Sequence, residues 1–193
     1  MDADRVERRK KALVIFLAFI MVSSSVAFIF IGYGGGQSST VKYNDYTFRQ
    51  RNSQWSTFVE KREALFDYLP ADVLDIEADS YAFTLLRSKL QIDSTLDENA
   101  TLTQEAALAQ YQLGEMLNFH NIYLRQGLTD PNEFSLPVIT CENANSFVPV
   151  LYFKEGNQTR IYTDGNCVIA EASQSFDMTR LKDRLLYGIL GII

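Results

Sequence analysis

Hydrophobic residues are concentrated in one long uncharged run near the N-terminus, and elsewhere they alternate with polar residues in shorter segments. Residues 12–33 contain no charged side chain and consist mainly of Leu, Ile, Phe, Val, Ala, Met and Ser. A helix of roughly 20 such residues crosses a hydrocarbon core about 30 Å thick. We therefore predict one transmembrane helix, acting as an uncleaved signal anchor, over residues 12–33.

The segments on either side of this run predict its orientation. Residues 1–11 hold five basic and three acidic residues, and the basic ones cluster next to the run. Positive charge beside a span favours retention in the cytoplasm. Residues 34–40 are rich in Gly and Ser, a composition typical of a flexible tether. We expect a cytoplasmic tail (1–11), the tether (34–40) and an extracytoplasmic domain (41–193), which places the protein in the cell membrane as a single-pass protein with its C-terminal domain outside.

Two other interpretations of the run stay open. A cleaved secretory signal has an apolar region of about 7–15 residues that ends at a small-x-small site, whereas here FIFIGY follows SSSVA and extends the run to membrane length. In the second interpretation, RRKKA followed by LVIFLAF resembles archaeal type IV pilin precursors, in which a peptidase cuts between the basic residues and the apolar stem. The glycines after the run disfavour the long continuous helix of such a stem.

The first part of the outer domain has the alternation of β-strands. Residues 41–50 and 54–62 are rich in aromatic and β-branched residues and alternate in part, which predicts a hairpin with RNS at its turn. Residues 63–69 fit either a third strand or a helical turn that stops before Pro70. Pro70 itself suits the first turn of a short helix.

A strand–helix–strand pattern follows over roughly residues 88–126. The helix, at 101–119, is rich in Ala, Leu, Gln and Glu, and Thr101 and Gln104 have the spacing of a capping box. Apolar residues on either side of the helix read as strands. We therefore predict a βαβ unit.

The last third of the chain predicts three strands and a closing helix. The strands are expected at 147–153, 159–163 and 167–172. Asp164-Gly165 predicts a tight turn between the last two, and we expect all three to form a C-terminal β-meander. Residues 175–193 have apolar residues at helical spacing, with Asp177 as the predicted N-cap. The expected fold class is therefore α+β, with one mixed α/β domain after the transmembrane helix.

Two features of the outer domain agree with an extracytoplasmic location. Its two cysteines, Cys141 and Cys167, are the only ones in the chain, and such pairs form disulfides in oxidising compartments. In addition, Asn99 and Asn157 begin sequons for glycosylation. We predict the disulfide and regard the two asparagines as possible glycosylation sites.

Charge and chemistry exclude several functions. Without residues 1–11 the chain has a net charge of −8, which disfavours nucleic-acid binding and flat docking on an anionic membrane. A single histidine, His120, excludes a two-histidine metal site, and we expect it in a strand with its ring hydrogen-bonded. Asp75, Glu77 and Asp79 lack the glycine and distal glutamate of a calcium-binding EF-hand loop, so a solvated face is expected. We assign no catalytic, cofactor-binding or metal-ligating residue and no cofactor, and the small-molecule ligand is unknown.

The C-terminal ~60 residues, PVITCENA…VLYF…GNQTRIYTDGNCVI…DMTRLKDRLLYGILGI, resemble uncharacterised short single-pass membrane proteins of small-genome archaea. The resemblance implies an archaeal host, one N-terminal anchor and an outward-facing domain that carries this cysteine pair. It implies no activity and transfers no catalytic residue.

The leading hypothesis is a non-enzymatic, membrane-anchored binding or assembly module with protein partners in the cell envelope. One alternative is a pilin-like structural subunit with a processed N-terminus. Another is an anchored thioredoxin-like protein for thiol exchange, because the element order has some likeness to a thioredoxin core. The chain lacks C-x-x-C, however, and its cysteines are 26 positions apart.

Overall fold

The computed structural model describes residues 15–21 and 39–193 of the chain. Residues 15–21 form a helix, and Thr40–Ile193 form a separate compact unit. The predicted tail and most of the predicted span and tether lie outside the described residues. Among the residues that are described, no helix is long and apolar enough to cross a membrane.

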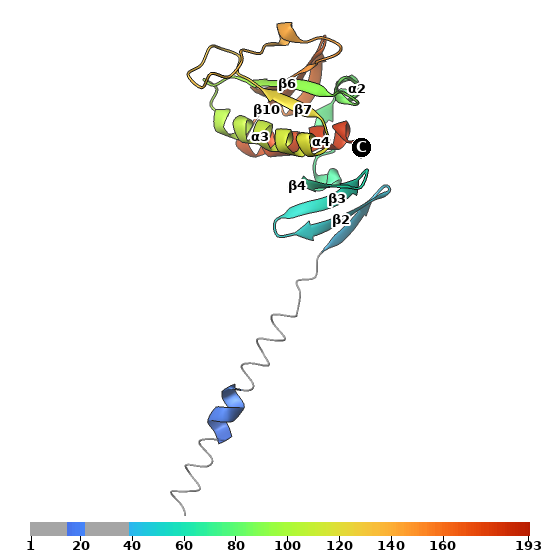
Figure 1. The fold of residues 1–193 in the computed structure, drawn as a ribbon, viewed down its shortest axis with the longest axis vertical. Coiled ribbons are helices and arrows are strands. Elements are labelled where there is room, and N and C mark those ends of the chain that lie inside the picture. The colour runs from blue at the N-terminus through green and yellow to red at the C-terminus, as the bar shows by residue number, and fades with distance from the viewer. Residues whose placement is uncertain (1–14, 22–38) are drawn as a thin grey trace, which may run out of the picture. The chain divides into compact units, whose positions relative to one another are not determined.

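The compact unit begins with an antiparallel four-stranded sheet whose strands are neighbours in chain order (Figure 1). The strands are β1 (Thr40–Tyr43), β2 (Tyr46–Arg51), β3 (Gln54–Val59) and β4 (Arg62–Phe66). Two-residue turns connect them, and positive φ angles occur at Asn44 (50°), Asn52 (56°) and Glu60 (50°). Tight hairpin turns require such angles, which asparagine adopts readily. The region predicted as one hairpin therefore forms a sheet of four strands. One of the differences is the turn that begins at Asn44, which the sequence analysis missed.

A six-stranded sheet with its helices forms the rest of the unit. The elements are η1 (Pro70–Asp72), β5 (Glu77–Ala78), α2 (Ser80–Leu86), β6 (Gln91–Leu96), α3 (Thr103–Phe119), β7 (Tyr123–Gln126), η2 (Cys141–Asn143), β8 (Val150–Glu155), β9 (Arg160–Asp164), β10 (Cys167–Ala172) and α4 (Ser175–Ile189). The strand order is β5-β9-β10-β8-β6-β7. β6, β7, β8 and β10 run parallel, and β9 is antiparallel to β10.

The predicted βαβ unit is confirmed as β6-α3-β7, but its capping box is wrong. Neither Thr101 nor Gln104 caps α3; the residue before the helix is Leu102, which makes no side-chain cap. The carboxylate of Glu155, at the end of β8, accepts hydrogen bonds from the N–H groups of Thr101 (2.7 Å) and Leu102 (3.3 Å). A neighbouring strand thus supplies the anionic group that a helix N-terminus favours.

The three C-terminal strands exist as predicted, but they do not form a meander. β9 and β10 make the expected hairpin through Gly165 (φ 59°). β10 then inserts between β9 and β8 and pairs with β8 in parallel. All six residues of β10 are buried, whereas Ile161 is the only buried residue of β9. A strand that is apolar on both faces gains most from a central position, and this outweighs chain-order pairing.

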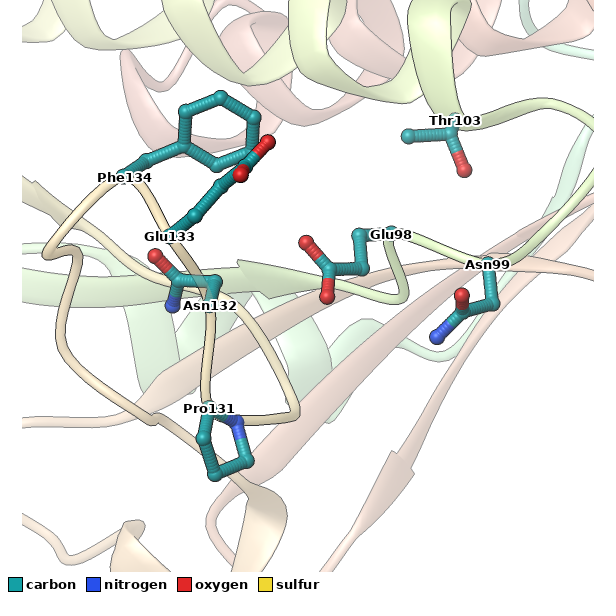
Figure 2. A pocket seen from close by; sticks show the side chains of 7 residues that line it. All are labelled: Glu98, Asn99, Thr103, Pro131, Asn132, Glu133 and Phe134. Atoms are coloured by element: carbon teal, nitrogen blue, oxygen red, sulfur yellow. The ribbon is translucent and has the colours of Figure 1, made fainter.

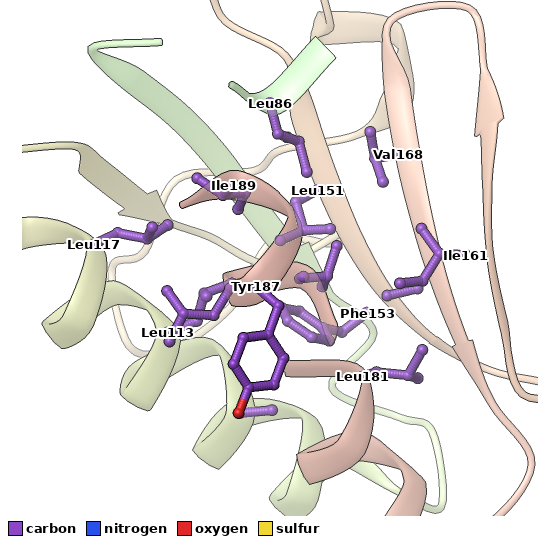
Figure 3. Close-up of a cluster of buried hydrophobic side chains, with 14 of the residues drawn as sticks. Leu86, Leu113, Leu117, Leu151, Phe153, Ile161, Val168, Leu181, Tyr187 and Ile189 are labelled. Carbon is purple, nitrogen blue, oxygen red and sulfur yellow. The ribbon is translucent and has the colours of Figure 1, made fainter. Parts of the chain in front are cut away.

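Helices α3 and α4 lie between the two sheets (Figure 1). Figure 3 shows the largest hydrophobic cluster, in which side chains of α4 pack with those of α2, α3, β8, β9 and β10. Tyr187 of α4 stacks on Phe66 of β4, with ring centroids 4.0 Å apart, and Phe48 of β2 packs edge-on against both rings. The apolar residues at helical spacing in α4 are buried: Met178, Leu181, Leu185 and Ile189. Ile192, which follows the helix, is buried as well.

The N-terminal turn of α4 differs from the prediction. Gln174 occupies the cap position, and Asp177 lies inside the first turn. Asp177 is 4% exposed and accepts hydrogen bonds from Thr159 (2.5 Å) and Arg180 (3.1 Å). It therefore joins α4 to the segment between β8 and β9 instead of capping the helix.

Candidate functional site

The feature with the most unusual surface is the segment from 127 to 149, which links β7 to β8. Its first half doubles back on itself: the N–H of Leu128 donates to Pro137 (3.0 Å), and that of Ile139 donates to Leu128 (2.9 Å). Gly127 permits this close approach, because a Cβ there would lie 2.5 Å from the Pro137 oxygen. We call residues 127–149 the stapled loop, for the disulfide described next.

The predicted disulfide between Cys141 and Cys167 is present, with Cα atoms 5.2 Å apart. It joins η2 of the stapled loop to the first residue of β10. Cys167 is fully buried, and it packs with Ile139 and Val150 in a second hydrophobic cluster. The bond therefore holds the loop against the six-stranded sheet.

Asparagine side chains fix the second half of the stapled loop. Asn143 Oδ1 accepts from the N–H of Thr140 (2.8 Å). Asn145 Oδ1 accepts from the N–H groups of Phe147 (3.0 Å) and Val148 (2.9 Å). Such side-chain turns hold irregular backbone in one conformation. The loop is consequently a shaped surface.

Several large apolar side chains of this loop are exposed to solvent. Phe134 is 65% exposed and Phe147 is 84% exposed, and Leu136 and Val138 lie between them in the sequence at 40% and 48%. A folded protein normally buries residues of this size, and those left outside together often mark a binding surface. Their position on a fixed loop lowers the entropy cost of binding.

A polar cavity of about 710 Å³ lies beside Phe134. The turn after β6 and the stapled loop form its walls, and Figure 2 shows Glu98 pointing toward the part of the loop that carries Asn132 and Glu133. In the described part of the chain, neither Glu98 nor Glu133 has an ion-pair or hydrogen-bond partner for its carboxylate. The cavity therefore presents two unpaired negative charges to solvent.

A second cavity, of about 320 Å³, lies next to the disulfide. It is lined by Thr95, Thr129, Thr140, Cys141, Glu142 and Tyr152. Thr95 is fully buried, and its hydroxyl has no hydrogen-bond partner in the described structure. Burial, together with the negative charges of Asp97 and Asp130, raises the pKa of Tyr152, so its phenol stays neutral. The cavity offers neutral hydroxyl groups beside a sulfur atom.

His120 does not lie in a strand as expected. It caps the C-terminal end of α3, and its Nε2 is buried without a hydrogen-bond partner. Burial and the nearby Arg62 lower its pKa. Its ring packs edge-on against that of Phe119, with ring centroids 5.9 Å apart.

Asp75 and Glu77 are exposed and Asp79 is half-buried, in agreement with the expected solvated segment, and two of the three also have partners in the described structure. Asp75 pairs with Arg180, at 2.5 Å, and Asp79 caps α2 through the N–H of Tyr81, at 2.9 Å. Asp79 also accepts from Thr163 of β9, at 2.7 Å. In residues 15–21 and 39–193, no group of three or more His, Cys, Asp or Glu side chains is arranged to hold a metal ion.

The asparagines of both sequons are exposed, as the sequence analysis expected. Asn99 lies in the turn after β6 and lines the polar cavity, and Asn157 lies in the turn between β8 and β9. A glycan on Asn99 would border the cavity that holds Glu98. Asn157 is part of no described cavity.

Comparison with protein-family models, with curated proteins and with solved structures found no match. The site is therefore described from its own residues. The sequence analysis did not single out Glu98, Phe134 or Phe147 as site residues. The available signal was a phenylalanine that directly follows a polar stretch in each of TDPNEFSLP and ENANSFV.

Proposed function

We propose that this protein is a membrane-anchored binding module of the cell envelope whose stapled loop contacts a protein partner. The observation that carries the proposal is the exposed apolar surface of a loop that a disulfide holds in place. Phe134 and Phe147 are the two most exposed of its large side chains. Aromatic residues of this kind are the usual anchors of protein interfaces.

The charge beside this surface indicates the chemistry of the partner. Glu98 and Glu133 lack partners in the described structure and border the polar cavity next to Phe134. A lysine or arginine of the partner would pair with them while its apolar neighbours cover the phenylalanines. Complementary charge of this sort sets the orientation of binding more than its strength.

The uncharged run at 12–33 and the cysteine pair support an envelope location. A span with basic residues on its N-terminal side directs the following domain outward, where disulfides persist. The tether at 34–40 then gives the domain reach toward its partner. Protease added to intact cells or to spheroplasts from the native host should degrade the C-terminal domain, and sodium carbonate should not extract the intact protein.

Site-specific photo-crosslinking in intact membranes tests the interface. A photoreactive phenylalanine analogue at position 134 or 147 should give an adduct of the same mass, and Glu98→Gln with Glu133→Gln should lower its yield. The matched control is the analogue at Tyr111, which is 55% exposed on α3. Absence of any adduct, or equal adducts at Tyr111, would contradict the proposed interface.

A thiol-exchange function is the second candidate, because Cys141 lines a cavity and Cys167 is buried. A thiolate entering the cavity would attack the Cys141 sulfur and displace the Cys167 thiolate. Alkylation of the native protein at low concentrations of reductant measures this reaction. Modification of Cys141 while the domain remains folded favours exchange, and resistance until unfolding favours a structural bond.

A further inference from the structure

Arg184 of α4 is a partly buried cation without an acidic partner in the described structure. Its Nε is buried and makes no hydrogen bond, and burial lowers the pKa of the guanidinium group. The arginines at four other positions each pair with a carboxylate: Arg51, Arg125, Arg160 and Arg180. A cation that is removed from water normally gains an anionic partner in return. Among the described arginines, Arg184 is the one whose side chain has a buried nitrogen without a hydrogen-bond partner.

The structure fixes the position of this cation. The Phe83 ring of α2 lies against Gly188, and a Cβ at Gly188 would overlap that ring. The guanidinium carbon of Arg184 is 5.2 Å from the centre of the same ring. A cation stacked on an aromatic face is held there by the quadrupole of the ring. Phe83 thus supports Arg184 from one side.

A second arginine is fixed beside the same segment of α4. Arg87 Nε donates to the carbonyl of Gly188 (2.6 Å), and its Nη2 donates to that of Ile193 (2.7 Å). These two main-chain oxygens orient the Arg87 side chain. Its Nη1 group makes no hydrogen bond within the described structure.

Both arginines open into one cavity of about 660 Å³, which we call the arginine pocket. Its other lining residues are Tyr43, Asn44, Leu74, Ala78, Ser80, Phe83, Thr84 and Ile193. No carboxylate side chain is among them, whereas Glu98 and Glu133 line the polar cavity and Glu142 lines the one beside the disulfide. The side chains that line this pocket thus include two cations and no acid.

We propose that the arginine pocket binds a phosphate group, carried by a soluble phosphomonoester or by the headgroup of a phospholipid. The guanidinium groups of Arg87 and Arg184 supply forked N–H donors that match phosphate oxygens. The hydroxyl of Ser80 adds a neutral donor at the rim. Leu74 and Phe83 form apolar walls for the carbon skeleton attached to the phosphate.

The pocket lies close to the start of the domain along the chain. Tyr43 lines it and is the last residue of β1, whose first residue is Thr40. At about 3.3 Å per residue, the strand separates them by roughly 10 Å. If the domain is tethered at its N-terminus as proposed above, a lipid headgroup is within reach, so this carrier alone rests on the proposed function. A soluble phosphomonoester does not depend on it.

Thermal unfolding of the full chain in neutral detergent tests the pocket. Inorganic phosphate and glycerol 3-phosphate are titrated in one arm, and mixed micelles with phosphatidylglycerol or phosphatidylcholine form the other. We expect at least one of these phosphate carriers to raise the unfolding temperature. Arg184→Gln should weaken the binding of that carrier about tenfold or more, because it removes one charge-assisted contact. Soluble phosphate alone identifies a free ligand, and phosphatidylglycerol alone identifies a lipid.

Two controls separate the pocket from general electrostatics. Arg49→Gln removes the same charge from an exposed position of β2 and should leave binding unchanged. Without ligand, Arg184→Gln should be at least as stable as the native protein, because it removes a cation that burial disfavours. No stabilisation by any of the probes, or an equal loss with Arg49→Gln, would overturn the proposal, and neither result bears on the stapled loop.

Discussion

Asp183, completely buried on α4, accepts a 2.8 Å hydrogen bond from the main-chain N–H of Tyr68, two residues after the four-stranded sheet ends. The same oxygen accepts from the N–H of Asp67, also at 2.8 Å. Lys182 contacts both acids, with Nζ 2.5 Å from Asp67 and 2.9 Å from Asp183. This cluster ties the four-stranded sheet to the helix layer through charges inside the protein.

The cluster predicts a pH dependence of stability. Burial raises the pKa of Asp183 from 3.8 to about 6, against the opposing effect of Lys182. A carboxyl group whose pKa is raised by folding contributes stability below pH 3.8 and loses that contribution as the pH rises through about 6. The free energy of unfolding, measured in urea, should therefore fall by about 2 kcal/mol relative to Asp183→Asn between about pH 4 and pH 7. A constant difference between the two proteins would contradict this.

The disulfide should make a large contribution to stability. It closes a loop with a sequence separation of 26 residues, and constraint of the unfolded chain predicts about 3.5 kcal/mol. Cys141→Ala with Cys167→Ala should lower the free energy of urea unfolding by about that amount. The double variant should no longer respond to reductant, whereas the native protein should. The disulfide can be removed by the double substitution or by reductant. A loss of unfolding free energy well below 1 kcal/mol in both cases would mean that non-covalent contacts hold the stapled loop in place without the bond.

Glu155 should stabilise α3 from outside the helix. Its carboxylate accepts from the N–H groups of Thr101 and Leu102, where the positive end of the helix dipole lies. Glu155→Ala should lower the free energy of unfolding by about 1 kcal/mol, as the loss of a helix cap does. Glu133→Ala, which removes an exposed carboxylate without a partner in the described structure, should change it little. Equal effects of the two changes would show that net charge, not capping, is responsible.

Local patterns predicted most elements of the domain but not the pairing of its strands. Residues 101–119 and 175–193 have helical spacing, and Asp164-Gly165 marked its turn, so those elements were found. The place of β10 between β8 and β9 depends on burial of both of its faces, which only the assembled sheet requires. The cap from Glu155 likewise comes from a strand far along the chain.

The only part of the candidate site that could be predicted from the sequence is the disulfide, because the chemistry of cysteine is evident from the residue type alone. Two cysteines predict a disulfide without knowledge of the fold, and the structure confirms Cys141 with Cys167. The arginine pocket had no such signal. Arg87 and Arg184 are ordinary in sequence, and they become unusual because Phe83 and Gly188 bring α2 and α4 together.

That contact between α2 and α4 provides the last prediction. A Cβ at Gly188 would overlap the Phe83 ring, so Gly188→Ala should destabilise the protein by about 1–3 kcal/mol through overpacking. Gly114→Ala is the matched control, because it is also helical and its closest neighbour is the flexible end of Gln126, at 3.1 Å. Alanine is favoured in helices by about 1 kcal/mol, so this control should be neutral or stabilising.

A double-mutant cycle shows whether the ring causes the loss. Phe83→Leu makes room above Gly188, and in that background Gly188→Ala should cost less in urea unfolding than it does in the native protein. The coupling between neighbouring residues of this kind is typically about 0.5–3 kcal/mol. Equal costs in both backgrounds would place the strain elsewhere on α4.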